Sequence, residues 1–243
     1  MNIIGIIPCR YESSRFPGKP IAQIHGKPML WHVWSQSKKT KFLNRVIVAT
    51  DSDRIYNVGL EYDIETILTS DQHKTGTDRV SEVAKQIDGD IFINIQGDEP
   101  LIDPASIDKL VEVLINDKSV DIVNAFSLIE NMSDIVNSNI VKVVTSAEEF
   151  ALAYSRSPIP HPKQSEPIYK RQIGLYAFRN KEILKFSNLP IGYLENTEGI
   201  EMYRYIENGY PIKMVEVDDR SIPVDVPGDI GRVEKLMVGK ENL

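Results

Sequence analysis

A short basic stretch, RYESSRFPGKP at residues 10–20, follows directly behind the first hydrophobic segment of the chain. Its three cations are Arg10, Arg15 and Lys19. Guanidinium groups can hold phosphate oxygens in a bidentate manner, and a lysine offers a compact charge for a polyphosphate tail. Ser13 and Ser14 add hydroxyl donors, and Gly18 lets the backbone approach a ligand closely. The stretch matches neither a P-loop nor a glycine-rich dinucleotide turn, so it predicts another kind of phosphate-binding loop, with a solvated charged loop as the alternative.

Two aspartates stand where a divalent cation could be held. Asp98 follows a buried apolar run in NIQGDEP, and Asp225 precedes a proline-started helix in SIPVDVPGD. Mg²⁺ prefers carboxylate oxygens and shares its coordination shell with substrate phosphates, so the pair could clamp the ion on a phosphate group. The alternatives are an ordinary turn aspartate and an aspartate at the start of a helix. Glu99 is a poor co-ligand, because neighbouring side chains of an extended segment point in opposite directions.

The segment HKTGTDRV forms a polar turn into a predicted helix. Thr75, Gly76 and Thr77 would present hydroxyls and backbone N–H groups at the helix N-terminus, which could bind a nucleobase edge or an anion. The alternative is a simple helix cap, and we expect Thr77 to be the capping residue.

Continuous apolar runs alternate with amphipathic segments over the first half of the chain. Runs without polar alternation are expected as strands buried on both faces. We expect strands at residues 2–8, 44–51, 63–69 and 90–100, and helices at 28–39, 51–60, 77–87 and 103–117. This alternation indicates βαβ units and a mostly parallel sheet. Ligands bind beyond the carboxyl ends of such strands, which is where residues 10–19, Asp51 and residues 96–99 fall.

The pattern changes after about residue 120. Strand-like segments lie closer together there, at 121–129, 139–146, 150–160, 169–179 and 211–217. They predict a mixed sheet or an added lobe. Two further helices are expected, one at 197–209 that Gly209 would end and one at 226–237.

Composition limits the class of protein. The chain has 243 residues, of which 42% are hydrophobic, and this is enough for a sizeable core. The formal net charge of −7 argues against a nucleic-acid binder, which would normally be basic. The single cysteine, Cys9, permits no intramolecular disulfide and is expected in the core. No segment approaches 18 uninterrupted apolar residues, so we expect no membrane association and a cytoplasmic protein.

Taken in order, eight stretches resemble the 3-deoxy-manno-octulosonate (Kdo) cytidylyltransferases. They are IIPCRYESSRFPGKPIAQIHGKPM, VIVATDSDRI, HKTGTDRVSEV, NIQGDEPLI, YSRSPIP, GLYAFR, LENTEGIEMYR and VDVPGDIGRVEKL. The resemblance covers nearly the full chain, and the R-Y-x-S-x-R-F/L-P-G-K-P block together with Q-G-D-E-P is far more specific than either motif alone.

The resemblance implies a nucleotide-diphosphosugar transferase-like α/β fold, with a mostly parallel, Rossmann-like sheet and a smaller mixed-sheet lobe. It implies one catalytic domain over residues 1–243, with a CTP-binding half at roughly 1–120 and a sugar-binding and dimerisation half at 121–243. The family is usually homodimeric. It joins CTP to the anomeric hydroxyl of a sugar acid, which gives a CMP-sugar and pyrophosphate, and the product points to lipopolysaccharide or capsule synthesis.

The resemblance also carries roles to individual positions. The triphosphate loop would be formed by Arg10, Ser13, Arg15 and Lys19. The stretch near the cytosine would be Thr75, Gly76, Thr77 and Arg79, together with Gln96 of the Q-G-D turn. The metal ligands for Mg²⁺ would be Asp98 and Asp225. The sugar pocket would contain Arg156, Gln172, Tyr176, Glu198, Glu201 and Met202.

The implied mechanism follows from charge. The sugar hydroxyl attacks the α-phosphorus of CTP in line, and pyrophosphate leaves. Magnesium held by Asp98 and Asp225 would neutralise the developing charge and lower the pKa of the attacking hydroxyl. Arg10, Arg15 and Lys19 would stabilise the leaving pyrophosphate, so that no histidine base is required.

Several positions depart from the family pattern. Gln172 stands where the family usually has histidine, and Met202 where it usually has glutamine. Pro223 and Gly228 replace a usual glycine and glutamate, and Cys9 replaces a usual alanine. The sugar half is therefore altered while the phosphate half is intact.

Four functions stay open at this point. The chain could act on Kdo, with neutral drift in the sugar pocket, or on 8-amino-Kdo or another ulosonic acid. It could use UTP or dTTP on a sugar phosphate, although the glycine-rich loop common in such enzymes is absent from the sequence. It could also be a non-catalytic nucleotide-binding regulatory protein, which the presence of Lys19, Asp98 and Asp225 disfavours.

Overall fold

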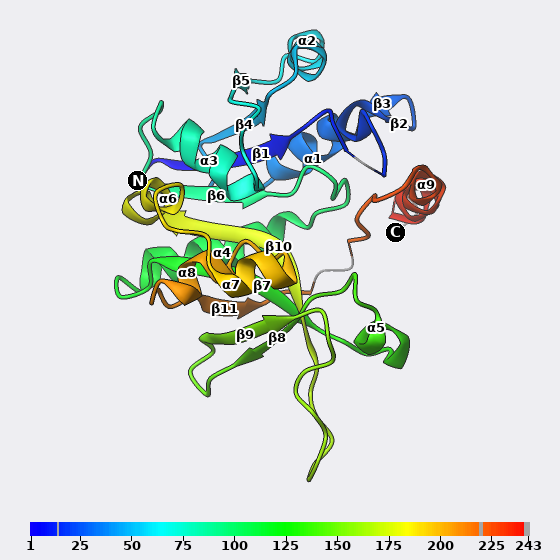
Figure 1. Cartoon of the computed structure of the whole chain (residues 1–243). Coiled ribbons are helices and arrows are strands. Elements are labelled where there is room, and N and C mark those ends of the chain that lie inside the picture. The colour runs from blue at the N-terminus through cyan, green and yellow to red at the C-terminus, as the bar shows by residue number, and fades with distance from the viewer. Residues whose placement is uncertain (14, 219–220, 241–243) are drawn as a thin grey trace.

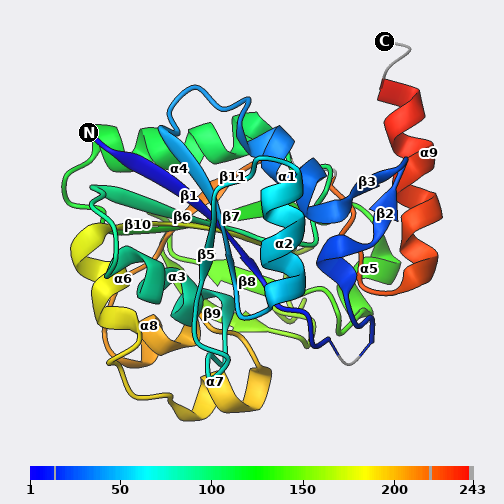
Figure 2. The same cartoon turned by 90° about the horizontal axis from the view of Figure 1, so that it is seen from above.

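A nine-stranded sheet runs through the part of the molecule that the structure describes (Figures 1 and 2). This computed structural model describes residues 1–13, 15–218 and 221–240, without the side chains of 239 and 240, so the hydroxyl predicted for Ser14 lies outside the described residues. The main strand order is β11-β7-β10-β6-β1-β4-β5, and β8 and β9 attach to one end of β10.

The elements alternate over the first half as the sequence predicts. The strands are β1 (Ile3–Cys9), β2 (Gln23–Ile24), β3 (Lys27–Pro28), β4 (Arg45–Thr50), β5 (Thr66–Leu68), β6 (Ile91–Ile95), β7 (Ile122–Leu128), β8 (Lys142–Thr145), β9 (Ala151–Ser155), β10 (Lys170–Arg179) and β11 (Lys213–Glu216). The α-helices are α1 (Met29–Ser37), α2 (Asp53–Glu61), α3 (Gly76–Ala84), α4 (Pro104–Asn116), α5 (Met132–Val136), α6 (Asn180–Phe186), α7 (Tyr193–Glu198), α8 (Tyr203–Glu207) and α9 (Ile230–Lys240). Short 3-10 turns lie at Lys19–Ile21 and Pro227–Asp229.

The sheet is mostly parallel, which confirms the predicted fold class. β1 pairs in parallel with β4 on one side and β6 on the other, and β11 pairs in parallel with β7. The exception in the main path is β10, which runs antiparallel between β6 and β7. The smaller antiparallel part is the β8–β9 hairpin at the start of β10.

Helices cover both faces of the sheet, and the strands contribute side chains to two separate hydrophobic cores. Side chains of α1, α2 and α4 pack on one face with Ile3 and Ile7 of β1. Side chains of α3, α6 and α8 pack on the other face with Ile4 and Ile6 of the same strand. Successive strand residues point to opposite faces, so a strand covered on both sides must be apolar throughout. This is why the first apolar run shows no polar alternation.

A third, smaller core ties the end of the chain to its beginning. Val224 and Val233 are buried against Ile24 and Met29 beside the β2–β3 hairpin. The backbone N–H of Val224 also donates to the carbonyl oxygen of Asp98 at 2.9 Å. Residues 221–240 therefore lie with the first half of the chain rather than with residues 121–218, although the sequence grouped them with the second half.

The structure differs from the predicted elements in the region after residue 180. The helix predicted at 197–209 is wrong as one helix, because Gly199 adopts a left-handed conformation (φ +65°) and ends α7. A turn follows, and α8 begins at Tyr203. The short helices α5 and α6 were not predicted. Among the described residues, no helix is long and apolar enough to cross a membrane.

Candidate active site

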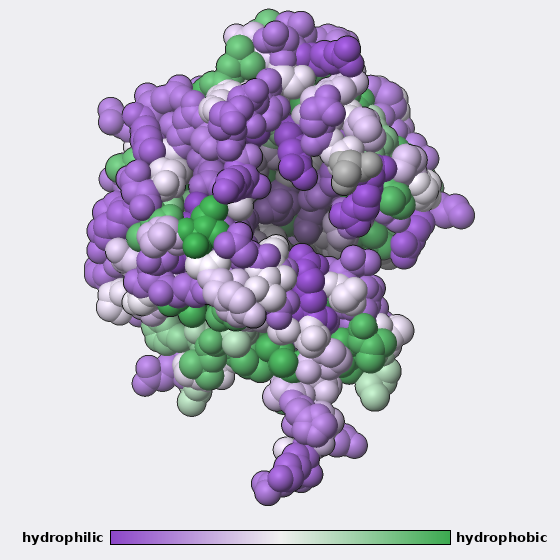
Figure 3. All heavy atoms as spheres, viewed as in Figure 1, coloured by the Kyte–Doolittle hydropathy of each residue, from purple (hydrophilic) through white to green (hydrophobic). Residues whose placement is uncertain are grey.

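Two adjoining cavities lie at the carboxyl edge of the sheet, where Figure 3 shows a hollow rimmed mostly by hydrophilic residues. The smaller one, the loop cavity, has a volume of about 300 Å³ and is bordered by the basic loop, residues 73–76 and residues 96–98. The larger one, the wide cavity, has a volume of about 660 Å³ and is bordered by residues 139–141, 171–174 and 199–201. Six residues border both cavities, and we call this set the junction. They are Lys74, Thr75, Gly76, Gln96, Asp98 and Asp225.

Strand direction explains why these segments meet. Parallel β1 and β6 bring the basic loop and the Gln96–Asp98 turn to one edge. β10 runs the other way, with Leu175 opposite Ile95 at the end of β6. The residues of β10 that precede Leu175 therefore extend past the carboxyl edge and form a wall of the wide cavity.

The basic loop is folded back by a glycine turn. Gly18 has φ +72°, a conformation that favours glycine, and its N–H donates to the carbonyl oxygen of Tyr11 at 2.8 Å. The Tyr11 ring lies 4.8 Å from the guanidinium carbon of Arg54, whose Nη1 donates to the Tyr11 hydroxyl at 2.7 Å. The turn places the predicted phosphate-binding residues on the wall of the loop cavity. They are Arg10, Ser13, Arg15 and Lys19.

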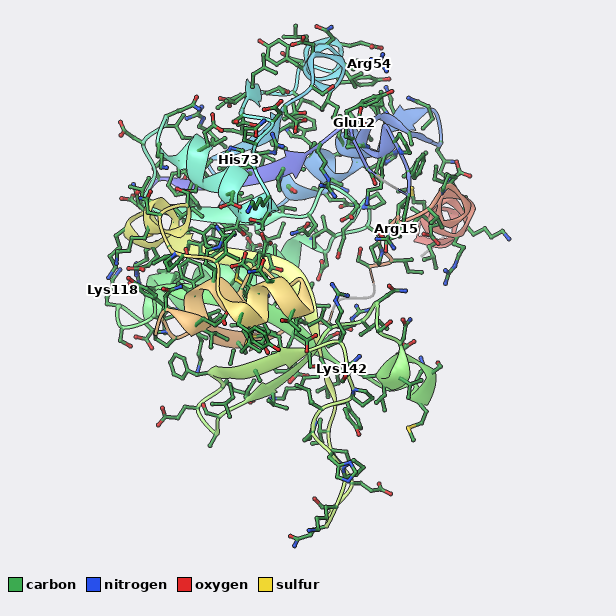
Figure 4. The ribbon with its side chains drawn as sticks, in the orientation of Figure 1. Glu12, Arg15, Arg54, His73, Lys118 and Lys142 are labelled. Atoms are coloured by element: carbon green, nitrogen blue, oxygen red, sulfur yellow. The ribbon has the colours of Figure 1, made fainter. Side chains whose placement is uncertain are left out.

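The two predicted metal aspartates converge on one cation. Nζ of Lys19 lies 2.6 Å from Oδ2 of Asp98 and 3.8 Å from Oδ1 of Asp225. Nη2 of Arg15 lies 3.0 Å from the same oxygen of Asp225 (Figure 4 labels Arg15). Two carboxylates repel one another unless a cation lies between them, and Lys19 is that cation here.

The start of α3 is capped by a different threonine than predicted. Oγ1 of Thr75 accepts from the N–H of Asp78 at 3.1 Å, and the Asp78 carboxylate accepts from the N–H of Thr75 at 3.1 Å, which forms a capping box. Thr77 is buried instead, donates its N–H to Glu201 and accepts from Asn94. Thr77 borders neither cavity, and its contact with a nucleotide stays a prediction.

Arg79 forms part of the floor of the loop cavity. Its Nη2 donates to Oδ2 of Asp51 at 2.6 Å, and its Nη1 donates to the hydroxyl of Thr69. Asp51, which the sequence placed at the ligand edge, thus holds this arginine in position.

A buried arginine joins the two walls of the site. Nη1 of Arg204 donates to Oδ1 of Asp78 at 2.6 Å, and its Nη2 donates to Oε1 of Glu195 at 2.6 Å. The guanidinium carbon also lies 4.1 Å from the centre of the Phe186 ring. Because Asp78 caps α3 and Glu195 belongs to α7, Arg204 links helices from the two halves of the chain. Burial raises the pKa of the neighbouring Glu201 carboxyl, which also borders the wide cavity.

Arg156, the predicted partner of a sugar carboxylate, borders the wide cavity. Its Nε donates to the carbonyl oxygen of Glu198 at 2.7 Å, and its Nη1 donates to that of Ser138 at 3.0 Å. The Glu198 carboxylate accepts from the hydroxyl of Ser155 and from the N–H of Arg156. Glu198 borders neither cavity and holds Arg156, so its contact with the substrate stays a prediction.

A buried lysine supports the same wall. Nζ of Lys142 donates to the carbonyl oxygens of Asn137, Ile140 and Arg156 at 3.0, 2.7 and 2.6 Å (Figure 4). Burial lowers the pKa of the Lys142 ammonium, and the charge of Arg156 lowers it further. These bonds fix the turn that carries Asn139 and Ile140 to the cavity.

Gln172 borders the wide cavity with a defined orientation. Asn124 donates both N–H groups to the carbonyl oxygens of Ile173 and Leu175, so its Oδ1 must accept. That oxygen accepts from Nε2 of Gln172 at 3.0 Å. Gln172 is thereby left with Oε1 as an acceptor and with the second N–H of Nε2 as a donor for a ligand. Nearby Tyr176 also borders the cavity, and burial raises the pKa of its phenol well above the ordinary value.

Two further residues behave as core. Met202 is fully buried in the second core and borders neither cavity, and its contact with the substrate stays a prediction. An apolar side chain at this position serves packing. Cys9 is 2% exposed, as predicted, and burial raises the pKa of its thiol to about 12.

Sequence reasoning missed four residues that shape the site. They are Lys74, Lys142, Glu195 and Arg204. Lys74 directly precedes the T-G-T motif, which was a usable signal. Lys142 binds backbone carbonyl oxygens, which any sequence supplies, and the Glu195–Arg204 pair acts through Asp78, which is 126 residues from Arg204 in the chain, so none of the three has a local signal.

Comparison with known proteins shows the class of enzyme to which this fold and site belong. Residues 4–217 match the family described as cytidylyltransferase. The chain is 34% identical to a solved CMP:2-keto-3-deoxy-manno-octonic acid synthetase complexed with CTP, with a TM-score of 0.94 over 99% of this chain and 100% of that one. A 4-diphosphocytidyl-2C-methyl-D-erythritol synthase from Anaerococcus prevotii, 15% identical with a TM-score of 0.65 over 98% of both chains, shares the fold. The fold and the site define a CTP-dependent nucleotidyltransferase.

Two relatives of this chain indicate which family of nucleotidyltransferases it belongs to. The 3-deoxy-manno-octulosonate cytidylyltransferase of Geotalea daltonii is 44% identical over 96% of this chain and 97% of its own length. The enzyme of the same name from Solibacter usitatus is 42% identical over 97% of this chain and 94% of its own length. The chain belongs to the 3-deoxy-manno-octulosonate cytidylyltransferase family.

We expect Lys142→Met to lower the free energy of unfolding by about 3 kcal/mol, because it leaves buried carbonyls without a donor. Lys170→Met is the matched control, since Nζ of Lys170 bonds to Thr145 and Glu149 at the partly exposed hairpin. It should cost about 1 kcal/mol. Urea denaturation of both variants measures the difference, and equal losses would contradict the supporting role of Lys142.

Proposed function

We propose that the chain transfers the cytidylyl group of CTP to Kdo, giving CMP-Kdo and pyrophosphate. The observation that carries the proposal is the pair of cavities meeting at the junction. A loop with three cations borders one cavity, and Arg156 borders the other. A triphosphate suits the loop cavity and a sugar acid suits the wide one, so the reacting atoms would meet between them. The names of the relatives and the CTP complex of the solved neighbour support these two substrates.

The reaction would take place at the junction. The anomeric oxygen forms a bond to the α-phosphorus, the bond from that phosphorus to the bridging oxygen breaks, and pyrophosphate leaves with the electron pair. The hydroxyl proton passes to water. Arg10, Arg15 and Lys19 border the cavity that would hold the leaving group, where they would stabilise its charge.

Magnesium fits the aspartates. Asp98 and Asp225 both lie within 3.8 Å of Nζ of Lys19, so their carboxylates could face one ion. The described residues contain no cluster of three or more potential metal ligands, and Mg²⁺ is usually held by one or two carboxylates together with substrate phosphates. When bound, the ion would neutralise phosphate charge and acidify the attacking hydroxyl.

Asp98→Asn should reduce magnesium-dependent pyrophosphate release from CTP and Kdo by about 100-fold or more, because one metal carboxylate is lost. Asp71→Asn is the control, since Asp71 is exposed and borders neither cavity. Thermal melting would verify that both variants fold. Turnover near that of the unmodified protein in Asp98→Asn would refute the role of this aspartate.

An amino-substituted substrate remains a second candidate, and Gln172 is the reason. Its Oε1 is left as an acceptor, and Glu195 and Glu201 also border the wide cavity. An ammonium group on the sugar would suit these groups. Pyrophosphate release with Kdo, 8-amino-Kdo and a sialic acid at equal concentration tests the assignment directly.

We expect Kdo to be the fastest substrate. Gln172→His should raise the ratio of the Kdo rate to the 8-amino-Kdo rate by about tenfold, because a charged or donor ring replaces an acceptor. Gln172→Asn keeps the acceptor and should change the ratio little. A higher rate with 8-amino-Kdo in the unmodified protein would reassign the substrate.

The location of the protein, the use of its product and its oligomeric state are inferred from the family to which the chain belongs. We infer that the protein acts in the cytoplasm, where CTP is made, and that its product donates the sugar to lipopolysaccharide or capsule.

We also infer that the protein forms a homodimer. Exposed apolar side chains gather on the β8–β9 hairpin, α5, the end of β7 and the long loop before β10, on the lower side of Figure 3. They are Leu128, Met132, Val136, Leu152 and Ile168. Such a patch is typical of an interface.

Size-exclusion chromatography with light scattering should give the mass of a dimer. Leu152→Asp should shift the mass to that of a monomer, because a charge would be buried at the contact. Leu60→Asp is the control: Leu60 is 62% exposed on α2, Leu152 is 60% exposed, and the two lie on opposite sides of the molecule (Figure 1). A monomeric unmodified protein would overturn the inference.

A further inference from the structure

Lys74 occupies a distinctive position in the site. Of the six junction residues, it is the one that carries a positive charge, whereas Asp98 and Asp225 carry negative charges. Lys19 and Arg15 border the loop cavity alone, and Arg156 borders the wide cavity alone. Lys74 is therefore the cation that both substrates could reach.

The ammonium of Lys74 is also available for a ligand. Within residues 1–13, 15–218 and 221–240, no carboxylate or carbonyl binds it, and its side chain is exposed. Three other cations of the site are already engaged: Lys19 with Asp98, Arg79 with Asp51 and Arg156 with the carbonyl oxygen of Glu198. A free cation costs less to recruit, because no existing ion pair has to break.

The backbone that carries Lys74 is held firmly. The next residue, Thr75, is fixed by the capping box with Asp78, and Asp78 is fixed by buried Arg204. Gly76 follows and packs on β1 and β6, where an added Cβ would lie 3.3 Å from Pro8. The exposed Lys74 side chain therefore extends from a fixed backbone, so only its own rotamers have to be ordered when it binds a ligand.

The proposed reaction brings two oxyanions to this place. The transferred phosphorus must bond to both substrates, so the α-phosphate has to lie where the cavities meet. In a ulosonic acid, the carboxylate is attached to the same carbon as the attacking hydroxyl, so it arrives beside the phosphate. Two anions would thus approach one another at the junction, whose charged residues other than Lys74 are Asp98 and Asp225.

We propose that Lys74 pairs with an oxyanion at the junction and stabilises it during cytidylyl transfer. The inference rests on the proposed function. The ligand chemistry is an oxyanion, which could be the α-phosphate of CTP or the carboxylate of the sugar acid.

Steady-state kinetics of Lys74→Met with CTP, Mg²⁺ and Kdo test the proposal. We expect kcat/KM to fall by about 10- to 100-fold, with an unchanged melting temperature because the side chain is exposed. Lys74→Arg should recover activity to within about threefold of the unmodified protein, since it keeps the charge. Lys85→Met at the other end of α3 is the control and should be fully active, because Lys85 borders neither cavity.

Two measurements separate the sources of the oxyanion. A lower kcat or weaker CTP binding by calorimetry, with an unchanged KM for Kdo, identifies the α-phosphate. A higher KM for Kdo with unchanged CTP binding identifies the carboxylate. Activity of Lys74→Met within twofold of an active unmodified protein overturns this inference alone. An unmodified protein that releases no pyrophosphate with any of the three sugar acids overturns the proposed function and this inference with it.

Discussion

The geometry of the site depends on one buried ion cluster, in which Arg204 lies between Asp78 and Glu195. Buried charges are tolerated only when they are paired and hydrogen-bonded, so each of the three groups fixes the other two. Asp78 in turn holds Thr75 at the junction, and Glu195 borders the wide cavity. The two walls that must hold the substrates therefore keep their separation because a single guanidinium group spans them.

Positively and negatively charged side chains lie close together in the site. An acidic protein concentrates three cations on one loop, and two of them pair directly with Asp98 and Asp225 in the wall of a cavity of about 300 Å³. Lys19 lies between Asp98 and Asp225, which keeps two like charges compatible. The same arrangement would attract a magnesium–triphosphate complex, because the carboxylates match the metal and the loop matches the phosphates. Positioning and electrostatics can then carry the chemistry without a histidine base.

Topology supplies the sugar side of the site. β10 runs antiparallel to its neighbours β6 and β7. Its first residues, rather than its last, therefore lie at the edge of the sheet where the parallel strands end. Lys142 and Arg156 then hold the turn at 137–140 through carbonyl oxygens. The chain end returns through the core around Val224 and Val233, which brings Asp225 to Asp98. Three separate parts of the chain are thus needed to close one site.

The sequence by itself determined the features that depend on near neighbours. Apolar runs predicted the buried strands, and the spacing around Gly18 predicted a cationic loop at a strand end, because these follow from local sterics and periodicity. Tertiary structure alone decided that Thr77 is buried against Asn94 and Glu201, that Met202 packs in the core, and that Arg204 joins the two walls. Each of these outcomes depends on partners distant in the chain, which strand order and packing bring together and which no local pattern records.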